Sequence, residues 1–406
     1  MTVFKYQLTA GREPINIDDY RRQARRSLPD MVWSFFDYGA EDNVTLAHNR
    51  EAFARYALRQ RVLVGNEPVD LGTTVAGDRL DLPVLLAPTG LSGLVHWSGE
   101  RAACVAAEKA GTLAVLSTAS SYSYEEVAEA TERDHFFQLY PYHDSSSSTG
   151  SMQNNVVASL MDRAQEAGFR AMFVTADVPM SGNKEAERRR GLGKPPVMTP
   201  RRAMSGALHP RWAYGFVRHQ RISMRNLVDT GGSRAAMSSL VKQERMMRRE
   251  LSWDDLAWMR KRWDGPLYVK GVLDPQDAAR AVDVGADGLV VSNHGGRQLD
   301  GAPASLDALP AIVERVGTGA EVLFDGGIRR GTDVIKALAL GARAVLIGRP
   351  YLYGLAVDGE NGVRRVLEIL GEEMSRAMTL MGVKSLADLD PSCVFPVGAP
   401  VVDQDR

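Results

Sequence analysis

The chain has 406 residues, which exceeds one average domain but fits a single α/β barrel with added loops. Apolar residues make up 44% and charged residues 24%, with 38 Gly and 19 Pro, so fibrous, collagen-like and broadly disordered classes are excluded. The 49 Lys and Arg residues nearly balance the 50 Asp and Glu residues, and the resulting net charge of −1 excludes the usual signature of a nucleic-acid-binding protein.

Two features indicate the compartment. Only Cys104 and Cys393 are present, and the first residues lack the charged, apolar and small-residue order of a secretion signal. No run approaches the roughly 18 apolar residues that a membrane-spanning helix needs. We therefore expect a cytoplasmic protein without a disulfide scaffold, in which any membrane contact is peripheral and on the inner face.

Two helices are predicted first along the chain. Residues 20–28 follow Asp18 and Asp19 and are rich in arginine, and after Pro29 a second apolar segment covers residues 31–38. We expect this helical lead-in to cap the bottom or the side of the main domain.

Eight short β-branched and apolar runs follow, each closed by a turn-forming residue and succeeded by a segment of helical periodicity. Repeated βα units have this pattern. We predict one α/β domain over residues 1–406, a (β/α)8 TIM barrel with the N-terminal helical segment and a long insertion after strand 4. The runs are residues 84–87, 113–117, 136–140, 172–176, 267–270, 288–292, 322–324 and 344–347.

A doubly wound open sheet is the alternative architecture. It would be favoured by a glycine-rich dinucleotide fingerprint between a strand and a helix. The segments 191–193 and 317–319 each read Gly-x-Gly but lack the third glycine and that setting. The barrel is therefore preferred.

The insertion covers residues 182–251 and is strongly basic. Residues 184–250 hold 16 Lys or Arg and 5 Asp or Glu, so this stretch carries +11 and the rest of the chain −12. Each basic group near an anionic membrane contributes about 1 kcal/mol of attraction. A membrane-association segment and a solvated lid or subunit contact both remain open. The apolar residues that we expect to be exposed here are Trp212, Tyr214, Phe216, Val217, Met246 and Met247.

Three further segments complete the prediction. Residues 362–381 have the spacing of an amphipathic helix, with an apolar side that includes Val363 and Leu367. The residues beyond Asp390 are expected to form a loose tail. Residues 144–151 are of low complexity and predict a loop tip.

Titratable side chains follow several of the runs. In a barrel the carboxyl ends of the strands form the active face. The sixth run leads into His294 and Arg297, the fourth into Asp177, the third ends in Tyr140, and the fifth ends in Lys270. An imidazole and a guanidinium side by side can remove a proton and hold a carboxylate, so we expect these groups to converge on one mouth.

The last two runs end in small residues and arginines. Residues 325–329 read Asp-Gly-Gly-Ile-Arg and residues 348–349 read Gly-Arg. Barrels commonly bind phosphate at this place, so a phosphate-bearing cofactor is implied. No His-x-x-x-His spacing or cysteine pair supports a metal site. Each feature alone is also explained as a turn, a strand end or a surface charge.

Together these motifs resemble the FMN-dependent L-2-hydroxy acid oxidase and dehydrogenase family, and within it the sequence is most similar to the mandelate dehydrogenases. Residues 208–212 and 216–219 resemble the mandelate dehydrogenase segment that serves as a membrane anchor. The motifs that carry the resemblance are residues 28–29, 39–42, 87–90, 137–140, 292–298, 325–327 and 336–341.

The resemblance implies roles for individual residues. His294 would accept the substrate proton, Asp177 would stabilise the imidazolium, Arg297 would hold the carboxylate, and Tyr140 would donate near the reacting hydroxyl. Lys270 would lie by the pyrimidine edge of the flavin. Further FMN contacts would come from Pro88, Thr89, Gly90, Ser117, Gln138, Thr175, Ser292, Asp325 and Gly326, and phosphate contacts from Gly327, Arg329, Gly348 and Arg349.

Two substrate-binding positions depart from the family pattern. Phe35 stands where the family has a tyrosine, and Lys184 stands where it has a second arginine. Lysine is a point charge on a flexible stem and does not replace the planar fork of arginine. Either Arg297 carries the carboxylate mainly alone, with Arg188 as a substitute partner, or the substrate is larger or modified. Gly90 resembles the mandelate dehydrogenases, whereas family oxidases often have alanine there.

The resemblance predicts FMN-dependent oxidation of an L-2-hydroxy acid, aryl-substituted and mandelate-like, to the 2-keto acid. Electrons would pass to a quinone or another acceptor, and the enzyme would be a homotetramer without nucleic-acid partners. The same chemistry with oxygen on a larger or modified substrate is one alternative. Others are a flavin-free phosphate-binding isomerase or aldolase that uses Lys270 as a Schiff-base amine, and a barrel retained as a binding module.

Overall fold

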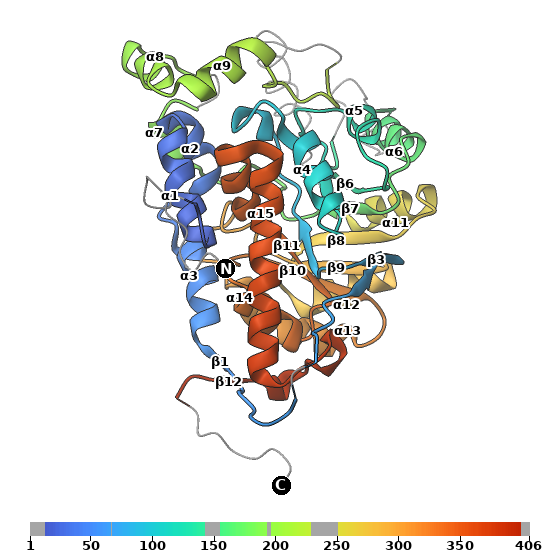
Figure 1. The fold of residues 1–406 in the computed structure, drawn as a ribbon. Coiled ribbons are helices and arrows are strands. Elements are labelled where there is room, and N and C mark those ends of the chain that lie inside the picture. The colour runs from blue at the N-terminus through green and yellow to red at the C-terminus, as the bar shows by residue number, and fades with distance from the viewer. Residues whose placement is uncertain (1–12, 66, 143–154, 193–195, 229–250, 399–406) are drawn as a thin grey trace, which may run out of the picture.

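The protein folds around an eight-stranded parallel sheet (Figure 1). The computed structural model describes residues 13–65, 67–142, 155–192, 196–228 and 251–398. An isolated parallel bridge between Leu86 and Ala114 joins the two end strands, so the sheet closes into a barrel. The strands are β4 (Val84–Leu86), β5 (Val115–Ser117), β6 (Phe136–Leu139), β7 (Met172–Thr175), β8 (Leu267–Val272), β9 (Gly288–Val291), β10 (Glu321–Asp325) and β11 (Ala344–Ile347).

All eight predicted runs are strands of this barrel, so the predicted TIM barrel is confirmed. In six strands every residue is buried. A parallel strand has the barrel interior on one face and helices on the other, which explains the continuous apolar runs. The helices around it are α4 (Gly99–Lys109), α5 (Tyr124–Ala128), α6 (Asn155–Glu166), α11 (Trp253–Arg262), α12 (Pro275–Asp283), α13 (Ser305–Val316), α14 (Gly331–Ala339) and α15 (Arg349–Met381), and a 3-10 turn, η1 (Ser92–Leu94), follows β4.

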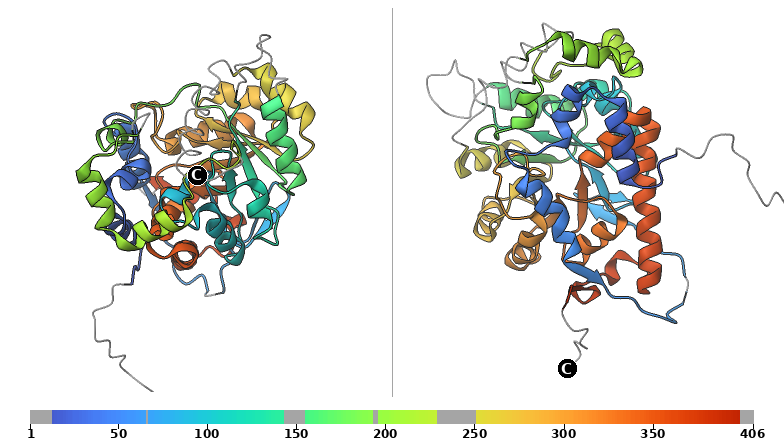
Figure 2. Two further views of the ribbon diagram at one scale, coloured as in Figure 1. Left: turned by 90° about the horizontal axis from the view of Figure 1, so that it is seen from above. Right: turned by 90° about the vertical axis from the view of Figure 1, so that its left-hand side faces the viewer.

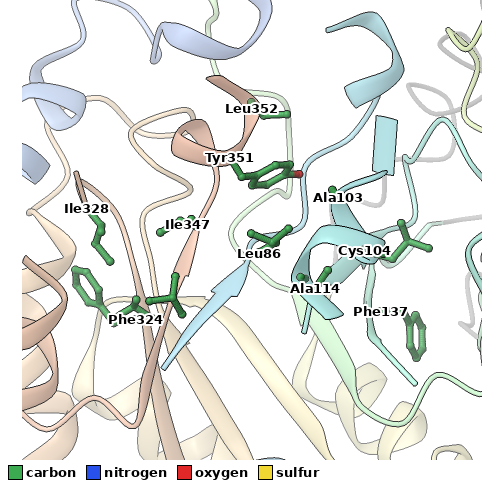
Figure 3. Packing of buried hydrophobic residues seen from close by; sticks show 14 of the residues in the cluster. Leu86, Ala103, Cys104, Ala114, Phe137, Phe324, Ile328, Ile347, Tyr351 and Leu352 are labelled. Atoms are coloured by element: carbon green, nitrogen blue, oxygen red, sulfur yellow. The ribbon is translucent and has the colours of Figure 1, made fainter. Parts of the chain in front are cut away.

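The layer between strands and helices is densely apolar (Figure 3). Leu86 and Ile347, on the paired strands β4 and β11, lie beneath the ring of Tyr351 in the first turn of α15. Ala103 and Cys104 bring α4 against the same region. The amino end of α15 is therefore held firmly over the barrel.

A hairpin closes the end of the barrel at which the strands begin. Its strands are β2 (Thr73–Val75) and β3 (Asp78–Leu80). Val75 and Leu80 are fully buried among the interior side chains of the barrel. The amide of Ala76 and the hydroxyl of Tyr268 both donate to Glu321 Oε2, at 3.1 and 2.5 Å. A site that is open to solvent is therefore expected at the other end of the barrel, where the strands have their carboxyl ends.

The N-terminal helices cover the side of the barrel. They are α1 (Ile17–Ser27), α2 (Asp30–Asp37) and α3 (Val44–Ala54). α1 packs along α15 (Figure 1). The sequence led us to expect these helices at the bottom or at the side of the barrel. The expectation of the bottom is wrong, because the β2–β3 hairpin occupies that end.

Residues 391–398, the described part of the segment beyond Asp390, form regular structure, contrary to the predicted loose tail. Residues Val394–Pro396 form β12, which pairs antiparallel with β1 (Tyr56–Leu58). Two 3-10 turns precede it, η2 (Leu386–Asp388) and η3 (Pro391–Cys393). Strands of three residues are too short to show an alternating pattern, so the sequence did not indicate this pairing.

The described part of the insertion contains three helices, α7 (Glu185–Arg189), α8 (Pro200–Ala207) and α9 (Pro210–His219). Figures 1 and 2 show α8 and α9 beyond α2 and α7, at the end of the molecule opposite β1 and β12. Trp212 Nε1 donates to the carbonyl of Leu94 at 2.7 Å, and the rings of His219 and Trp97 stack at 4.1 Å. α9 is therefore docked on the loop that follows β4.

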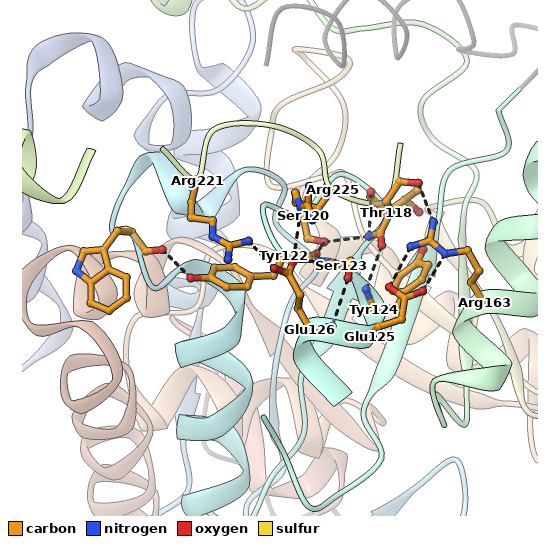
Figure 4. A network of polar contacts seen from close by, with 12 residues as sticks. Thr118, Ser120, Tyr122, Ser123, Tyr124, Glu125, Glu126, Arg163, Arg221 and Arg225 are labelled. Carbon is orange, nitrogen blue, oxygen red and sulfur yellow. Dashed lines mark hydrogen bonds and ion pairs between the residues drawn. The ribbon is translucent and has the colours of Figure 1, made fainter. Parts of the chain in front are cut away.

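The chain returns from α9 to the barrel through residues 221–228, and a polar network fixes this return (Figure 4). Arg221 donates to Glu126 at 2.7 Å and lies over the ring of Tyr122. Asn226 is buried and accepts from the amide of Tyr124 at 3.1 Å. Residues 221–228 are thus attached to the barrel. Met246, Met247 and the predicted loop tip at 144–151 lie outside the described residues.

Candidate active site

One cavity of about 640 Å³ lies at the carboxyl ends of the barrel strands. Strand-end loops, α2 and the insertion all contribute to its wall. The predicted site residues that line it are Phe35, Pro88, Thr89, Gly90, Tyr140, Lys184, Lys270, His294, Arg297, Asp325, Gly326, Gly327, Arg329, Gly348 and Arg349.

Five predicted site residues do not line this cavity but lie beside it. Asp177 contacts His294, while Ser117, Gln138, Thr175 and Ser292 are buried at or just after the strand ends. The sequence therefore indicated the correct end of the barrel for every one of them.

His294 and Asp177 form a hydrogen-bonded pair. His294 Nδ1 lies 3.1 Å from Asp177 Oδ1 and 3.2 Å from Oδ2. Burial opposes ionisation of Asp177, but the interaction with His294 and the positive charge of Lys270 outweigh it, so the pKa of Asp177 lies below its usual value. A carboxylate on Nδ1 fixes the tautomer that carries the proton there. His294 lines the cavity, and in this tautomer its Nε2 is the ring nitrogen that can accept a proton.

The loop that carries His294 is wound in a left-handed conformation. His294, Gly295 and Gly296 have φ angles of 58°, 64° and 72°. A left-handed φ is unfavourable for histidine and easy for glycine, so the loop needs external support. Its support comes from α3: Asn49 and Asn293 exchange two amide hydrogen bonds, each of 2.8 Å.

The Gly-Ala-Glu-Asp motif of the sequence belongs to this support. The amide of Ala40 donates to the carbonyl of Gly296 at 2.8 Å. A Cβ on Gly39 would lie 2.4 Å from the same oxygen, so only glycine fits there. Asp300 accepts from the amides of Val44 and Thr45 at the start of α3. The motif therefore holds the N-terminal segment against the His294 loop.

Lys270 is a buried cation held by two polar partners. Its Nζ lies 2.7 Å from Asp325 Oδ2 and donates to Ser292 Oγ at 2.9 Å. Burial alone would lower its pKa, but Asp325 and Asp177 raise the pKa above the usual value. A nucleophilic amine must be neutral, so this environment disfavours the Schiff-base role and favours a fixed positive charge.

Arg297 has two partners that sequence reasoning did not identify. Its Nη1 donates to the carbonyl of Tyr38 at 2.9 Å, and its Nη2 lies 2.8 Å from Glu187 Oε1. Glu187 also lines the cavity. It was missed because Glu185–Arg189 resembles a solvated charge run, and a main-chain acceptor such as Tyr38 leaves no trace in sequence.

Two more arginines concentrate positive charge in the cavity wall. Arg349 donates to the carbonyls of Phe36, Gly295 and Tyr38 at 2.8, 2.9 and 3.0 Å. Burial, together with the charges of Arg297 and Arg329, lowers the pKa of Arg349 to about 10. Such crowding of like charges favours a bound anion.

Gly327 and Gly348, two residues predicted to contact phosphate, line the cavity. Gly348 precedes α15, whose first turn has no side-chain cap. Gly327 has a φ of 83°, and a Cβ there would lie 2.0 Å from the carbonyl oxygen of Asn49. Uncapped amides at a helix start bind phosphate readily.

Two orphaned polar atoms indicate where a cofactor would bind. Among the described residues, Gln138 Nε2 and Arg329 Nε are buried without a hydrogen-bond partner. Buried donors in native proteins are normally satisfied. Gln138 Oε1 accepts from Ser117, so its amide group has a fixed orientation. The residues present therefore fit a large ligand with acceptor atoms and a phosphate.

The remaining wall combines apolar surface with charge. Phe35 lines the cavity with a ring that offers no hydroxyl, and Tyr140 lines it with a phenol whose pKa is raised by burial. Lys184 and Arg188 line it from α7 and its N-cap. Three apolar side chains complete the lining. They are Leu91 and Leu94, at the N-cap and in η1, and Met224, in the segment that returns from α9.

The exposed face of the insertion differs in part from prediction. Tyr214 and Val217 are 71% and 70% exposed, as expected. Trp212 and Phe216 instead stack on each other at 4.8 Å, and Trp212 packs against the core. The outward apolar residues are Val197, Met198, Met204, Leu208, Tyr214 and Val217.

Neither a metal site nor a spanning helix is found in the described ranges. No group of three or more His, Cys, Asp and Glu residues there is arranged to hold a metal ion. Within the same ranges, none of the helices combines the length and apolarity required to cross a membrane.

Comparisons with known proteins cover almost the whole chain. The family model for FMN-dependent dehydrogenases matches residues 24–396. The chain is 43% identical over 389 residues to L-lactate oxidase from Nostoc sp., covering 95% of this chain and 99% of that protein. It is 40% identical over 380 residues to glycolate oxidase from Spinacia oleracea, covering 94% and 95%.

A solved structure extends the comparison to the whole fold. The structure of (S)-mandelate dehydrogenase, described as a monotopic membrane protein, superposes with a TM-score of 0.89 at 36% identity. The match covers 95% of this chain and all of that one.

Proposed function

The chain belongs to the FMN-dependent dehydrogenase family and is an enzyme that oxidises a 2-hydroxy acid; we propose that its substrate is an aryl-substituted, mandelate-like L-2-hydroxy acid. The observation that carries this proposal is the placement of His294 and Arg297 in one cavity of about 640 Å³ with the ring of Phe35. A base, a carboxylate-binding cation and an apolar wall are the three groups that such a substrate requires.

FMN is the cofactor of this enzyme, and the residues present fit it. Within the described ranges Gln138 and Arg329 offer unpartnered buried donors, and Gly327, Gly348 and Arg349 would hold the phosphate. Bound FMN supplies a two-electron acceptor for the substrate carbon. Lys270, held by Asp325 and Ser292, would supply a permanent positive charge to bound FMN, which would favour negative charge in the reduced cofactor.

We assign the proton of the substrate hydroxyl to His294. Nε2 accepts it, and Asp177 on Nδ1 stabilises the resulting imidazolium. Tyr140 lies on the same cavity and would donate a hydrogen bond to the substrate oxygen. Burial raises the pKa of Tyr140, so the phenol stays protonated and remains a donor at neutral pH.

Arg297 would hold the substrate carboxylate, assisted by the positive charge of Lys184. Of the five N–H groups of a guanidinium, Tyr38 and Glu187 engage one each, which leaves a fork for a carboxylate. Phe35 lacks a hydroxyl, so the cavity wall beside the guanidinium of Arg297 is more apolar than it would be with tyrosine. Such a wall favours a substrate whose reacting carbon carries an aryl group over one that carries a hydrogen atom or a methyl group.

We further propose that electrons leave to a membrane quinone or another acceptor. Gly90 supports this, because it resembles the glycine of the mandelate dehydrogenases, whereas family oxidases often have alanine at this position. The alternative acceptor is oxygen, which the similarity to L-lactate oxidase supports. Anaerobically reduced enzyme mixed with oxygen or with a soluble quinone distinguishes the two, and fast reoxidation by oxygen alone would contradict the quinone.

The α8–α9 face is proposed as a membrane-association surface. On this face the exposed apolar side chains of Met204, Leu208, Tyr214 and Val217 alternate with Arg201, Arg211 and Arg218. The face lies at the same end of the molecule as the cavity (Figure 1). Such a surface binds anionic lipid peripherally. Its placement would bring a lipid-dissolved acceptor near the active site. We also expect a homotetramer, which light scattering coupled to gel filtration tests.

A panel of 2-hydroxy acids tests the substrate proposal. The FMN-loaded enzyme is mixed without oxygen with (S)-mandelate, L-lactate and glycolate, and bleaching of the flavin absorption is followed. We expect the highest ratio of reduction rate to dissociation constant for (S)-mandelate. A higher ratio for lactate or glycolate would contradict the aryl preference while leaving the reaction class intact.

A further inference from the structure

Glu187 places a carboxylate inside a cavity that has to receive a carboxylate. Its side chain is 12% exposed, it lines the cavity, and its Oε1 lies 2.8 Å from Arg297 Nη2. Neither the sequence motifs nor the mechanism above gives it a role. An acidic group at this place repels anionic ligands, so its presence requires a reason.

Glu187 does not block Arg297. The pair uses one N–H of Nη2, the carbonyl of Tyr38 uses one of Nη1, and the remaining N–H groups stay available to a substrate carboxylate. The effect of Glu187 is therefore on charge and position: it holds the guanidinium in place and offsets one positive charge among Arg297, Lys184 and Arg188.

The position of Glu187 is firmly determined by the backbone around α7. The amide of Glu41 donates to the carbonyl of Asn183 at 2.9 Å, and the amide of Gly182 donates to Gln298 Oε1 at 3.2 Å. A Cβ on Gly182 would lie 2.3 Å from the carbonyl oxygen of Arg297, so the two segments are in direct contact. Moving the carboxylate out of the cavity would require this contact to open.

We propose that Glu187 is a specificity-determining residue that restricts the enzyme to 2-hydroxy acids with a single carboxylate. This inference rests on the proposed function. Arg297 binds the first carboxylate, and a second one within the same cavity would face the fixed negative charge of Glu187. Like charges in a partly buried site repel strongly because solvent screens them little. Exclusion of a competing ligand by such repulsion is an established route to specificity.

The test replaces Glu187 by a neutral residue of the same shape. Glu187→Gln retains an oxygen that accepts from Arg297 and removes the charge. Glu185→Gln is the matched control, because Glu185 lies on the same helix, pairs with the exposed Arg189 and does not line the cavity. FMN content and melting temperature, measured on both variants, establish that the fold is retained.

Two acid pairs that differ by one carboxylate provide the measurement. Propionate and succinate are titrated into the FMN-loaded proteins, and their dissociation constants are read from the flavin absorption spectrum. L-lactate and L-malate are compared by anaerobic flavin reduction. In Glu187→Gln we expect affinity for succinate relative to propionate, and the rate ratio of malate to lactate, to rise at least roughly tenfold, which corresponds to about 1.4 kcal/mol.

The outcomes separate this inference from the proposed function. An unchanged ratio in Glu187→Gln, or an equal rise in Glu185→Gln, would overturn the role of Glu187. If no 2-hydroxy acid reduces the wild-type flavin, the proposed function fails, and the binding ratio for propionate and succinate still decides the role of Glu187.

Discussion

Asn49 and Asn293 exchange two amide hydrogen bonds of 2.8 Å across the boundary between α3 and the loop that carries His294. Both side chains are buried. Asn49 Oδ1 also accepts from the amide of Ser305 at 3.1 Å, and Asn293 Oδ1 accepts from the amide of Gly296 at 3.1 Å. The N-terminal segment thus helps to hold the proposed base in its left-handed conformation.

Asn49→Ala is expected to reduce both stability and catalysis. It removes two buried hydrogen bonds from Asn293 and leaves the amide of Ser305 without its partner, which costs about 3 kcal/mol of unfolding free energy. The His294 loop should also lose its fixed geometry, so flavin reduction by substrate should slow at least roughly tenfold. Urea denaturation and anaerobic reduction measure the two effects. His48→Ala, an exposed neighbour on the same helix, should change neither.

Asp37 contributes a stability that depends on pH. Arg21 donates to both of its oxygens at 3.0 and 2.7 Å, and Tyr353 donates at 2.6 Å. Burial opposes ionisation, but these hydrogen bonds and the charge of Arg21 outweigh it, so the pKa of Asp37 lies below its ordinary value of 3.8. The stabilisation is therefore present above about pH 4 and is lost as pH falls through the folded-state pKa.

Asp37→Asn should consequently lower the unfolding free energy at pH 7 by about 2 kcal/mol, a figure reduced because Arg21 is 42% exposed. The difference from wild type should shrink when the pH falls below about 4. Denaturation across a pH series measures this. A difference that persists or grows at low pH would contradict the role of the charge. Asp30→Asn, exposed on the same helix, is the control.

Gln138 should contribute to FMN affinity. Its Nε2 is buried without a partner within the described part of the chain, and the proposed site would supply an acceptor. Gln138→Leu should raise the FMN dissociation constant about tenfold, the effect of one buried hydrogen bond with its desolvation. Fluorescence titration of the apoprotein with FMN measures it. Gln276→Leu, on the exposed surface of α12, should leave the constant unchanged.

The membrane proposal is tested by removing charge from α9. The double variant Arg211→Ala with Arg218→Ala should weaken binding to anionic vesicles about thirtyfold, since each charge contributes about 1 kcal/mol. Cosedimentation with phosphatidylglycerol vesicles measures the binding. Arg101→Ala with Arg376→Ala removes two exposed charges elsewhere and should have little effect. Equal loss in both double variants, or no binding by wild type, would count against this surface.

The barrel could be predicted because its strands are buried on both faces and end in turn-forming residues. The same reasoning located His294, Asp177 and Lys270, since strand ends in a barrel share one face. The β2–β3 hairpin and the β1–β12 pair could not be predicted, because strands of three residues carry no periodicity. Glu187 was missed because nothing in a charged run shows which side chain points inward.

Reduction of the flavin by substrate, measured in wild type and in His294→Ala, tests the central claim most directly. Both proteins are mixed without oxygen with (S)-mandelate in a rapid-mixing spectrophotometer, after their FMN content has been determined. We predict full FMN content in both and a reduction rate at least roughly 100-fold lower in His294→Ala, as expected when a general base is removed. A variant that bleaches at a near-normal rate would show that the imidazole is not the proton acceptor.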